Sequence, residues 1–70
     1  MQVYIVMEHN WDDGMIIVTP YVERRSAVEH YRATRRLWSG HGLTQETKDE
    51  FFLVEGRMEC RVYEEELHYE

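Results

Sequence analysis

The sequence predicts an α+β fold, a two-layer sandwich with one helix on one face of a four-stranded, mainly antiparallel sheet, in the order β-β-α-β-β. Three observations predict it. One segment has the apolar period of a helix, four have the composition or alternation of strands, and the connecting segments are polar or contain Gly and Pro. With 70 residues the chain has room for one core, so residues 1–70 form a single domain.

The predicted helix spans residues 22–38, with Pro20 before it and Ser39-Gly40 after it. At 100° per residue, one face collects small and aromatic side chains, and we expect that face to contact the sheet. Its residues are Ala27, Tyr31, Thr34 and Trp38. The opposite face is basic, because five arginines and two glutamates give the segment a net charge of +3.

The predicted strands span residues 2–8, 15–19, 49–55 and 57–67. The first two form a hairpin that turns at Asp13-Gly14, and Pro20 ends the second strand. Residues 39–48 are predicted to form an irregular loop. In an alternative, the last strand is short and the chain from Glu64 onward is a tail that contains His68.

The first three predicted strands are apolar on both faces, whereas the last alternates between apolar and charged side chains. A single helix covers only one face of a sheet. We therefore expect the other face to expose an apolar patch.

The net charge of −6 is unevenly distributed. Twelve acidic and three basic residues lie outside residues 22–39, so this part of the chain carries −9. An acidic surface disfavours generic binding to DNA or to an anionic membrane, because both require a positive potential. The arginine-rich helix is a basic island on an acidic protein.

Cysteine usage and hydropathy indicate a cytoplasmic protein, or one of the host cytoplasm if a phage encodes it. Cys60 is the only cysteine, so no intrachain disulfide can form. No apolar run approaches the ~20 residues that span a bilayer. The first residues also lack the basic start and apolar core of a signal peptide.

No residue pattern predicts an enzyme or a cofactor. His41 lies between two glycines, and the sequence offers no partner that would orient it as a base. We expect His30 to lie at the edge of the core with its ring nitrogens hydrogen-bonded. Cys60 alternates with Met58 and Val62, which predicts a buried thiol rather than a nucleophile.

A metal site is not predicted either. One turn crowds four potential ligands, but their spacing matches no established metal loop, and Asp-Asp-Gly is ordinary turn chemistry. The four residues are Glu8, His9, Asp12 and Asp13.

Two features are candidates for binding another protein. Trp11 at the hairpin tip is an anchor if it is exposed, although it can equally fold back onto the core. Acidic side chains can engage the basic groove of a nucleic-acid-binding protein, or they can simply keep the protein in solution. The candidate contacts are Trp11, Asp12, Asp13, Glu55, Glu59, Glu64, Glu65 and Glu66.

The basic helix face offers an alternative, in which Arg25, Arg32 and Arg36 contact nucleic acid. The acidic remainder of the chain favours a different interpretation, in which nearby carboxylates such as Glu29 pair with these arginines. A homodimer that buries the helix-free sheet face is a further alternative.

The segments VYIVMEH and YVERRSAVEHY are successive parts of one pattern. In this pattern a strand that ends near Glu-His is followed by a second strand and then by an Ala-led helix. In this pattern the first half of the chain resembles a group of small uncharacterised bacterial and phage domains. The resemblance implies the β-β-α arrangement and no activity, and the second half departs from it in its long final strand. The matching positions are Val3, Tyr4, Glu8, His9, Tyr21, Arg24 and Ala27.

Together these features predict a small acidic protein-binding module that regulates or inhibits a larger protein, of the kind that phages and mobile elements encode. The partner is expected to be a protein, with a homodimer as the alternative and nucleic acid or a membrane disfavoured.

Overall fold

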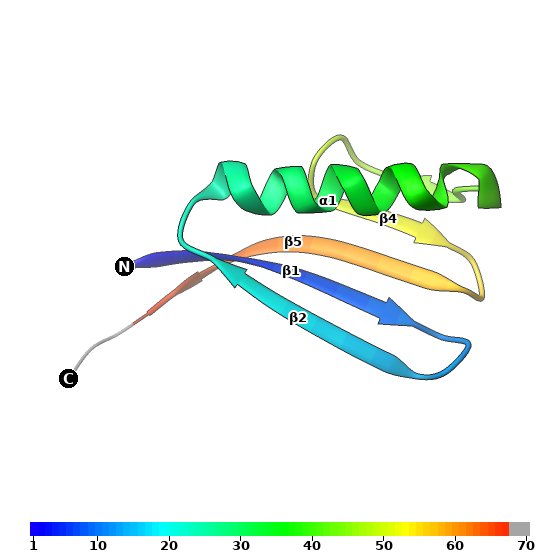
Figure 1. Cartoon of the computed structure of the whole chain (residues 1–70), viewed down its shortest axis with the longest axis horizontal. Coiled ribbons are helices and arrows are strands. Elements are labelled where there is room, and N and C mark those ends of the chain that lie inside the picture. The colour runs from blue at the N-terminus through cyan, green and yellow to red at the C-terminus, as the bar shows by residue number, and fades with distance from the viewer. Residues whose placement is uncertain (68–70) are drawn as a thin grey trace.

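The computed structural model describes residues 1–67, so His68 lies outside the described residues. The predicted α+β class is confirmed, but the sheet has five strands rather than four, all antiparallel and in the order β2-β1-β5-β4-β3 (Figure 1). The elements are β1 (Gln2–Asn10), β2 (Met15–Tyr21), α1 (Arg24–Trp38), a short 3-10 turn η1 (Ser39–His41), β3 (Gln45–Glu46), β4 (Phe51–Val54) and β5 (Met58–Glu66).

The additional strand, β3, lies in the segment predicted to be an irregular loop. It pairs with β4, and backbone bonds flank it on both sides, from Thr44 N to Leu53 O (2.8 Å) and from Thr47 N to Phe51 O (2.8 Å). A strand of two polar residues buries no side chain, so it leaves no hydrophobic pattern in the sequence.

Pro20 does not end the second strand, because β2 continues through it to Tyr21. β2 is an edge strand, and a proline without an N–H is tolerated where that position faces solvent. The last strand extends to Glu66, as in the longer of the two predictions.

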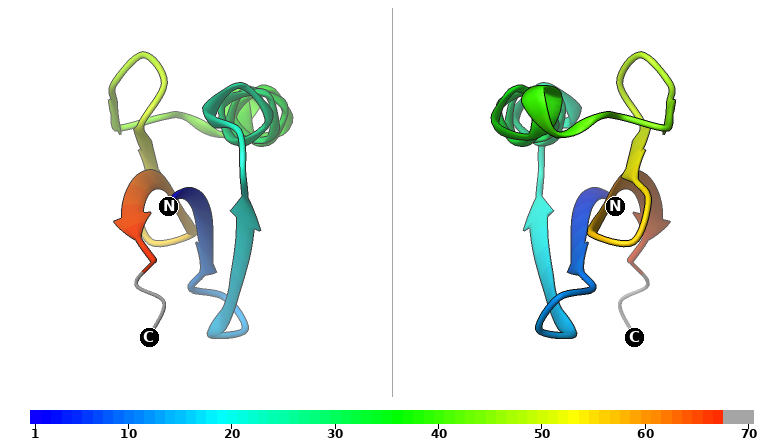
Figure 2. Two further views of the ribbon diagram at one scale, coloured as in Figure 1. Left: turned by 90° about the vertical axis from the view of Figure 1, so that its left-hand side faces the viewer. Right: turned by 90° about the vertical axis from the view of Figure 1, so that its right-hand side faces the viewer.

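The helix packs on one face of the sheet (Figure 2). The predicted side chains make this contact. Ala27 and Tyr31 are fully buried there, Thr34 is buried, and Trp38 packs partly against the core. Tyr31 contacts the Phe52 ring at 5.8 Å and donates from its hydroxyl to Thr47 O at 3.0 Å. The buried cluster consists of Val6, Ala27, Tyr31, Phe52, Val54, Met58 and Cys60.

The opposite face of the sheet carries no other described element (Figures 1 and 2). Strand register places Val18 beside Met7 on this face, and Ile16 beside His9. Both β2 side chains are more than half exposed. The expected apolar patch is therefore present, on the β1–β2 side of the sheet.

Candidate functional site

The outer edge of β2 is the most unusual surface of the described structure. Met15, Ile16, Ile17 and Val18 are consecutive, and each is between 47% and 58% exposed. Because successive side chains of a strand alternate, Ile16 and Val18 lie on the helix-free face, whereas Met15 and Ile17 lie on the helix side. Both sides of this edge are thus apolar and open to solvent.

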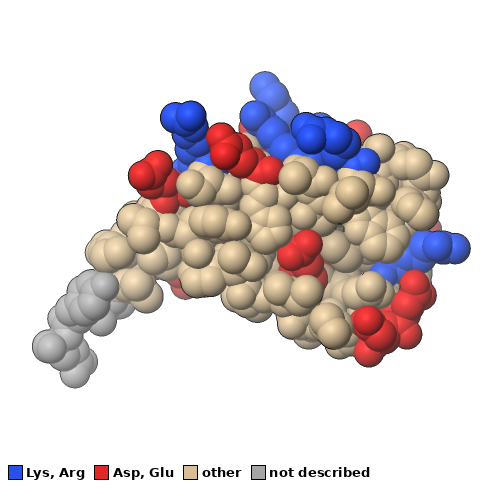
Figure 3. Space-filling model, viewed as in Figure 1, with Lys and Arg blue, Asp and Glu red and all other residues tan. Residues whose placement is uncertain are grey.

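Of the usual devices that protect a sheet edge, β2 has only a proline near its end. Edge strands are normally blunted by charged side chains, proline, bulges, short length or a covering element. β2 has seven residues, none of them charged, and only Pro20 interrupts its row of backbone N–H groups. In Figure 3 the basic side chains gather along α1, and a broad, largely uncharged area lies over the strands beneath it.

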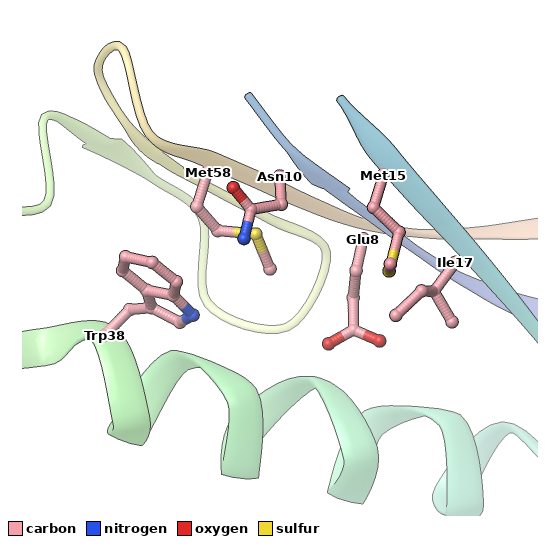
Figure 4. Close-up of a pocket in the computed structure, with 6 residues that line it drawn as sticks. All are labelled: Glu8, Asn10, Met15, Ile17, Trp38 and Met58. Atoms are coloured by element: carbon pink, nitrogen blue, oxygen red, sulfur yellow. The ribbon is translucent and has the colours of Figure 1, made fainter. Parts of the chain in front are cut away.

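A pocket of about 180 Å³ opens on the helix side of this edge, between β2 and the C-terminal end of α1. Figure 4 shows Trp38 on one side of the pocket, Met15 and Ile17 on the other, and the Glu8 carboxylate directed toward the helix. The pocket is lined by Glu8, Asn10, Met15, Ile17, Trp38 and Met58. Its walls are therefore mainly apolar, with one carboxylate and one amide.

Glu8 is held by two helix residues. Its Oε2 lies 3.2 Å from His30 Nε2, and its Oε1 lies 3.3 Å from the Thr34 hydroxyl. The other ring nitrogen of His30 lies 2.9 Å from the Tyr21 hydroxyl. His30 Nε2 is therefore placed to donate to the Glu8 carboxylate, and the Tyr21 hydroxyl contacts the other ring nitrogen.

This chain of contacts satisfies His30 at the edge of the core, as predicted, and it orients Glu8 along the pocket wall. The side chains of His30 and Glu8 are 22% and 19% exposed. Thr34 and Glu8 lie 26 positions apart in the sequence, and this separation explains why no local pattern revealed the site.

The predicted partner contacts fall at opposite ends of the sheet. Trp11, Asp12 and Asp13 occupy the β1–β2 turn, and Glu55 lies in the adjoining β4–β5 turn. Trp11 N bonds Arg57 O at 2.9 Å and so joins these two turns. Glu64, Glu65 and Glu66 lie at the far end of β5, where Glu66 pairs in register with Gln2. The structure does not bring the two groups together.

Trp11 neither projects freely nor enters the core. Its indole Nε1 donates to His9 Nδ1 at 3.0 Å, and the ring is 39% exposed. Glu59 is also engaged, since Arg61 Nε lies 2.9 Å from its Oε1, and the Arg61 guanidinium stacks over Phe51 at 4.6 Å.

The potential metal ligands of the first turn do not converge. Glu8 faces the helix and His9 the opposite side of the sheet, while Asp13 Oδ1 accepts from Met15 N at 2.8 Å. Within residues 1–67 no group of three or more such side chains is placed to hold a metal ion. No helix in this range is long and apolar enough to cross a membrane.

The basic helix face is partly neutralised by carboxylates. Arg25 pairs with Glu29 at 3.5 Å, as expected, and Arg32 Nε lies 2.8 Å from Asp49 Oδ1. Arg35 pairs with Glu46 of β3 at 3.6 Å. The contacts of Arg32 and Arg35 reach the loop and the short strand beside α1. Arg36, the third candidate nucleic-acid contact, is exposed in the last turn of α1.

Cys60 is fully buried, as predicted. Burial raises the pKa of its thiol to about 12, and the nearby Glu8 carboxylate adds to the effect. The thiol therefore stays protonated near neutral pH and is a poor nucleophile.

No family model matches the sequence, and comparison with curated proteins and with solved structures gives no significant match. The resemblance of the first half to small bacterial and phage domains stays a prediction.

Proposed function

We propose that this protein is a small protein-binding module that regulates a larger protein, and that an extended segment of the partner adds as a strand to β2. One observation carries the proposal: Met15–Val18 form an exposed, uncharged and apolar edge on a sheet whose other strands bury their helix-facing apolar side chains.

Strand addition suits this edge because it uses both backbone and side chains. The unpaired backbone groups of an edge strand supply affinity, and side chains on alternate positions supply specificity. Here Ile16 and Val18 would contact partner side chains on the helix-free face, while Met15 and Ile17 would contact those on the helix side. The partner segment should therefore be extended and apolar at several positions.

The test is a selection of peptides from a displayed library of random ten-residue sequences on the immobilised chain, followed by measurement of their affinities. We expect peptides with alternating apolar residues that protect the β2 amides from hydrogen exchange. The double variant Ile16→Lys/Val18→Lys places charges on the edge and should weaken binding by roughly tenfold or more, equivalent to about 1.4 kcal/mol.

Gln45→Lys/Thr47→Lys is the matched control, because it adds the same two charges at exposed positions of the opposite sheet edge, in and beside β3, and this variant should bind like wild type. Equal loss in both variants, or no peptide that protects β2, would overturn the proposal. Sedimentation at micromolar concentration tests self-association. A dimer that the double variant dissociates would identify a second copy as the occupant instead.

A further inference from the structure

The pocket beside β2 contains a partly buried carboxylate whose ion-pair partner is a histidine rather than a lysine or arginine. Among residues 1–67, Glu8 makes no ion pair with lysine or arginine, and its one charge-bearing contact is the imidazole of His30. The four other ion pairs between side chains in this range use arginine. Placing a carboxylate in an apolar setting is unfavourable unless other groups compensate its charge.

The hydrogen bonds to Glu8 leave acceptor capacity unused. The Thr34 hydroxyl is 3.3 Å from Glu8 Oε1 and 3.0 Å from His30 O, so one proton is shared between two acceptors. An ionised carboxylate offers about four lone-pair sites, and His30 and Thr34 occupy at most two. A donor that enters the pocket can therefore bind Glu8 without displacing either residue.

The remaining walls suit the stem of a basic side chain. Met15, Ile17 and Met58 offer apolar surface to methylene groups, and Trp38 offers an aromatic ring to a cation. Asn10 adds a polar wall, although its amide oxygen accepts from Asp12 N at 3.0 Å. The pocket thus combines an apolar passage, an aromatic wall and an anionic end.

We propose that this pocket receives a lysine or arginine side chain of the partner segment. This inference rests on the strand addition proposed above. A strand beside β2 lies roughly 10 Å from β1, since neighbouring strands are about 4.8 Å apart. A long basic side chain on the helix side of that strand extends over Met15 and Ile17 toward Glu8 and covers most of this gap.

A second copy of the chain does not supply this group through the same contact. Residues 15–21 contain no lysine, arginine or histidine, so pairing β2 with its own copy leaves both Glu8 carboxylates without a cation. The charge of the pocket therefore favours a different protein as the partner.

The experiment titrates two blocked amino acids, Nα-acetyl-lysine methylamide and its norleucine analogue, into isotopically labelled protein at constant ionic strength. We expect the lysine compound to shift the NMR signals of the Trp38 indole and of the Met15 and Ile17 amides in a saturable manner. The norleucine compound, which lacks only the charged group, should bind at least about tenfold more weakly, because it offers Glu8 neither a positive charge nor a hydrogen-bond donor.

Glu8→Gln preserves the size of the side chain and should weaken lysine binding by a similar factor. Glu55→Gln is the matched control, since it removes the same charge from the exposed β4–β5 turn, and it should have no effect. Equal binding of both compounds, no saturable shift, or unchanged binding in Glu8→Gln would overturn the inference.

The two proposals fail in different ways. Ile16→Lys/Val18→Lys alters the face of β2 opposite the pocket, so it should weaken peptide binding and leave lysine binding unchanged. If selected peptides bind β2 equally well with norleucine in place of every basic residue, strand addition is supported and the cation pocket is excluded.

Discussion

The two edges of the sheet are built in opposite ways. At one edge, β3 has only two residues, both polar, and the helix fastens the chain around it through Arg35–Glu46, Arg32–Asp49 and the hydroxyl of Tyr31. At the other, β2 has seven residues without a charge, and no residue of α1 forms an ion pair with it.

This difference leaves one edge of the sheet protected and the other open. An unprotected apolar edge promotes unwanted pairing between chains, and proteins generally avoid it. The β3 edge shows that this chain contains the means of protection, namely a very short strand and charged contacts. The strand addition proposed above would cover the edge that β2 leaves open.

The largest expected effect contrasts a buried side chain next to the β3 edge with an exposed one on β2. Phe52 is fully buried, and Phe52→Ala should lower the free energy of unfolding by about 3–5 kcal/mol. Ile16 is 58% exposed, and Ile16→Ala should change the free energy of unfolding by no more than about 0.5 kcal/mol. Urea unfolding followed by circular dichroism measures both. A large cost for Ile16→Ala would mean that β2 is already packed in the isolated chain.

A second contrast uses thiol reactivity. The pKa of about 12 makes the Cys60 thiolate rare near pH 8, so an aromatic disulfide reagent should react with it roughly a thousandfold more slowly than with an ordinary thiol. In the variant Ile16→Cys, the added thiol lies on the exposed edge. We expect one equivalent to react fast and one slowly, and both to react fast in denaturing urea. Rapid reaction of both thiols in the folded variant would contradict the closed structure around Cys60.

Most of the fold could be predicted because its main elements are governed by local patterns. The spacing of Ala27, Tyr31 and Thr34 fixes which side of α1 is buried, and the turn at Asp13-Gly14 fixes the first hairpin. β3 could not be predicted, since two polar residues carry no periodic signal. Its partners Leu53 and Phe52 lie only eight and six residues further along, but residues 47–50 between them contain no Gly or Pro that would predict a hairpin turn.

The candidate site was less predictable because it depends on strand order. The apolar character of both β2 faces was visible in the sequence, but a run such as residues 15–19 would be buried in a central strand. It is exposed because β5 pairs along the whole of β1 and leaves β2 at the edge. The predicted contact residues followed charge and turn position instead, and these criteria do not identify an open edge.

The smallest expected effect concerns the charges that hold the β3 side. The hydrogen bond from Arg32 and its positive charge lower the pKa of Asp49, while desolvation opposes the shift. A carboxyl whose pKa is lower in the folded state stabilises the fold above its unfolded pKa and loses this contribution as the pH falls through the folded value. Asp49→Asn should therefore lower the melting temperature at pH 7 by no more than about 3 °C, and the difference should vanish well below pH ~4.

Amide exchange locates that effect at one edge. Loss of the Arg32–Asp49 contact should speed exchange at Thr44 and Thr47, whose N–H groups bond β4, and leave exchange in β2 unchanged. The double variant Arg32→Gln/Asp49→Asn should be little less stable than either single variant, because each already removes the same interaction. Additive losses, or faster exchange in β2, would show that these charges support the whole sheet. Since no charged side chain lies on β2, we expect the two edges to respond independently.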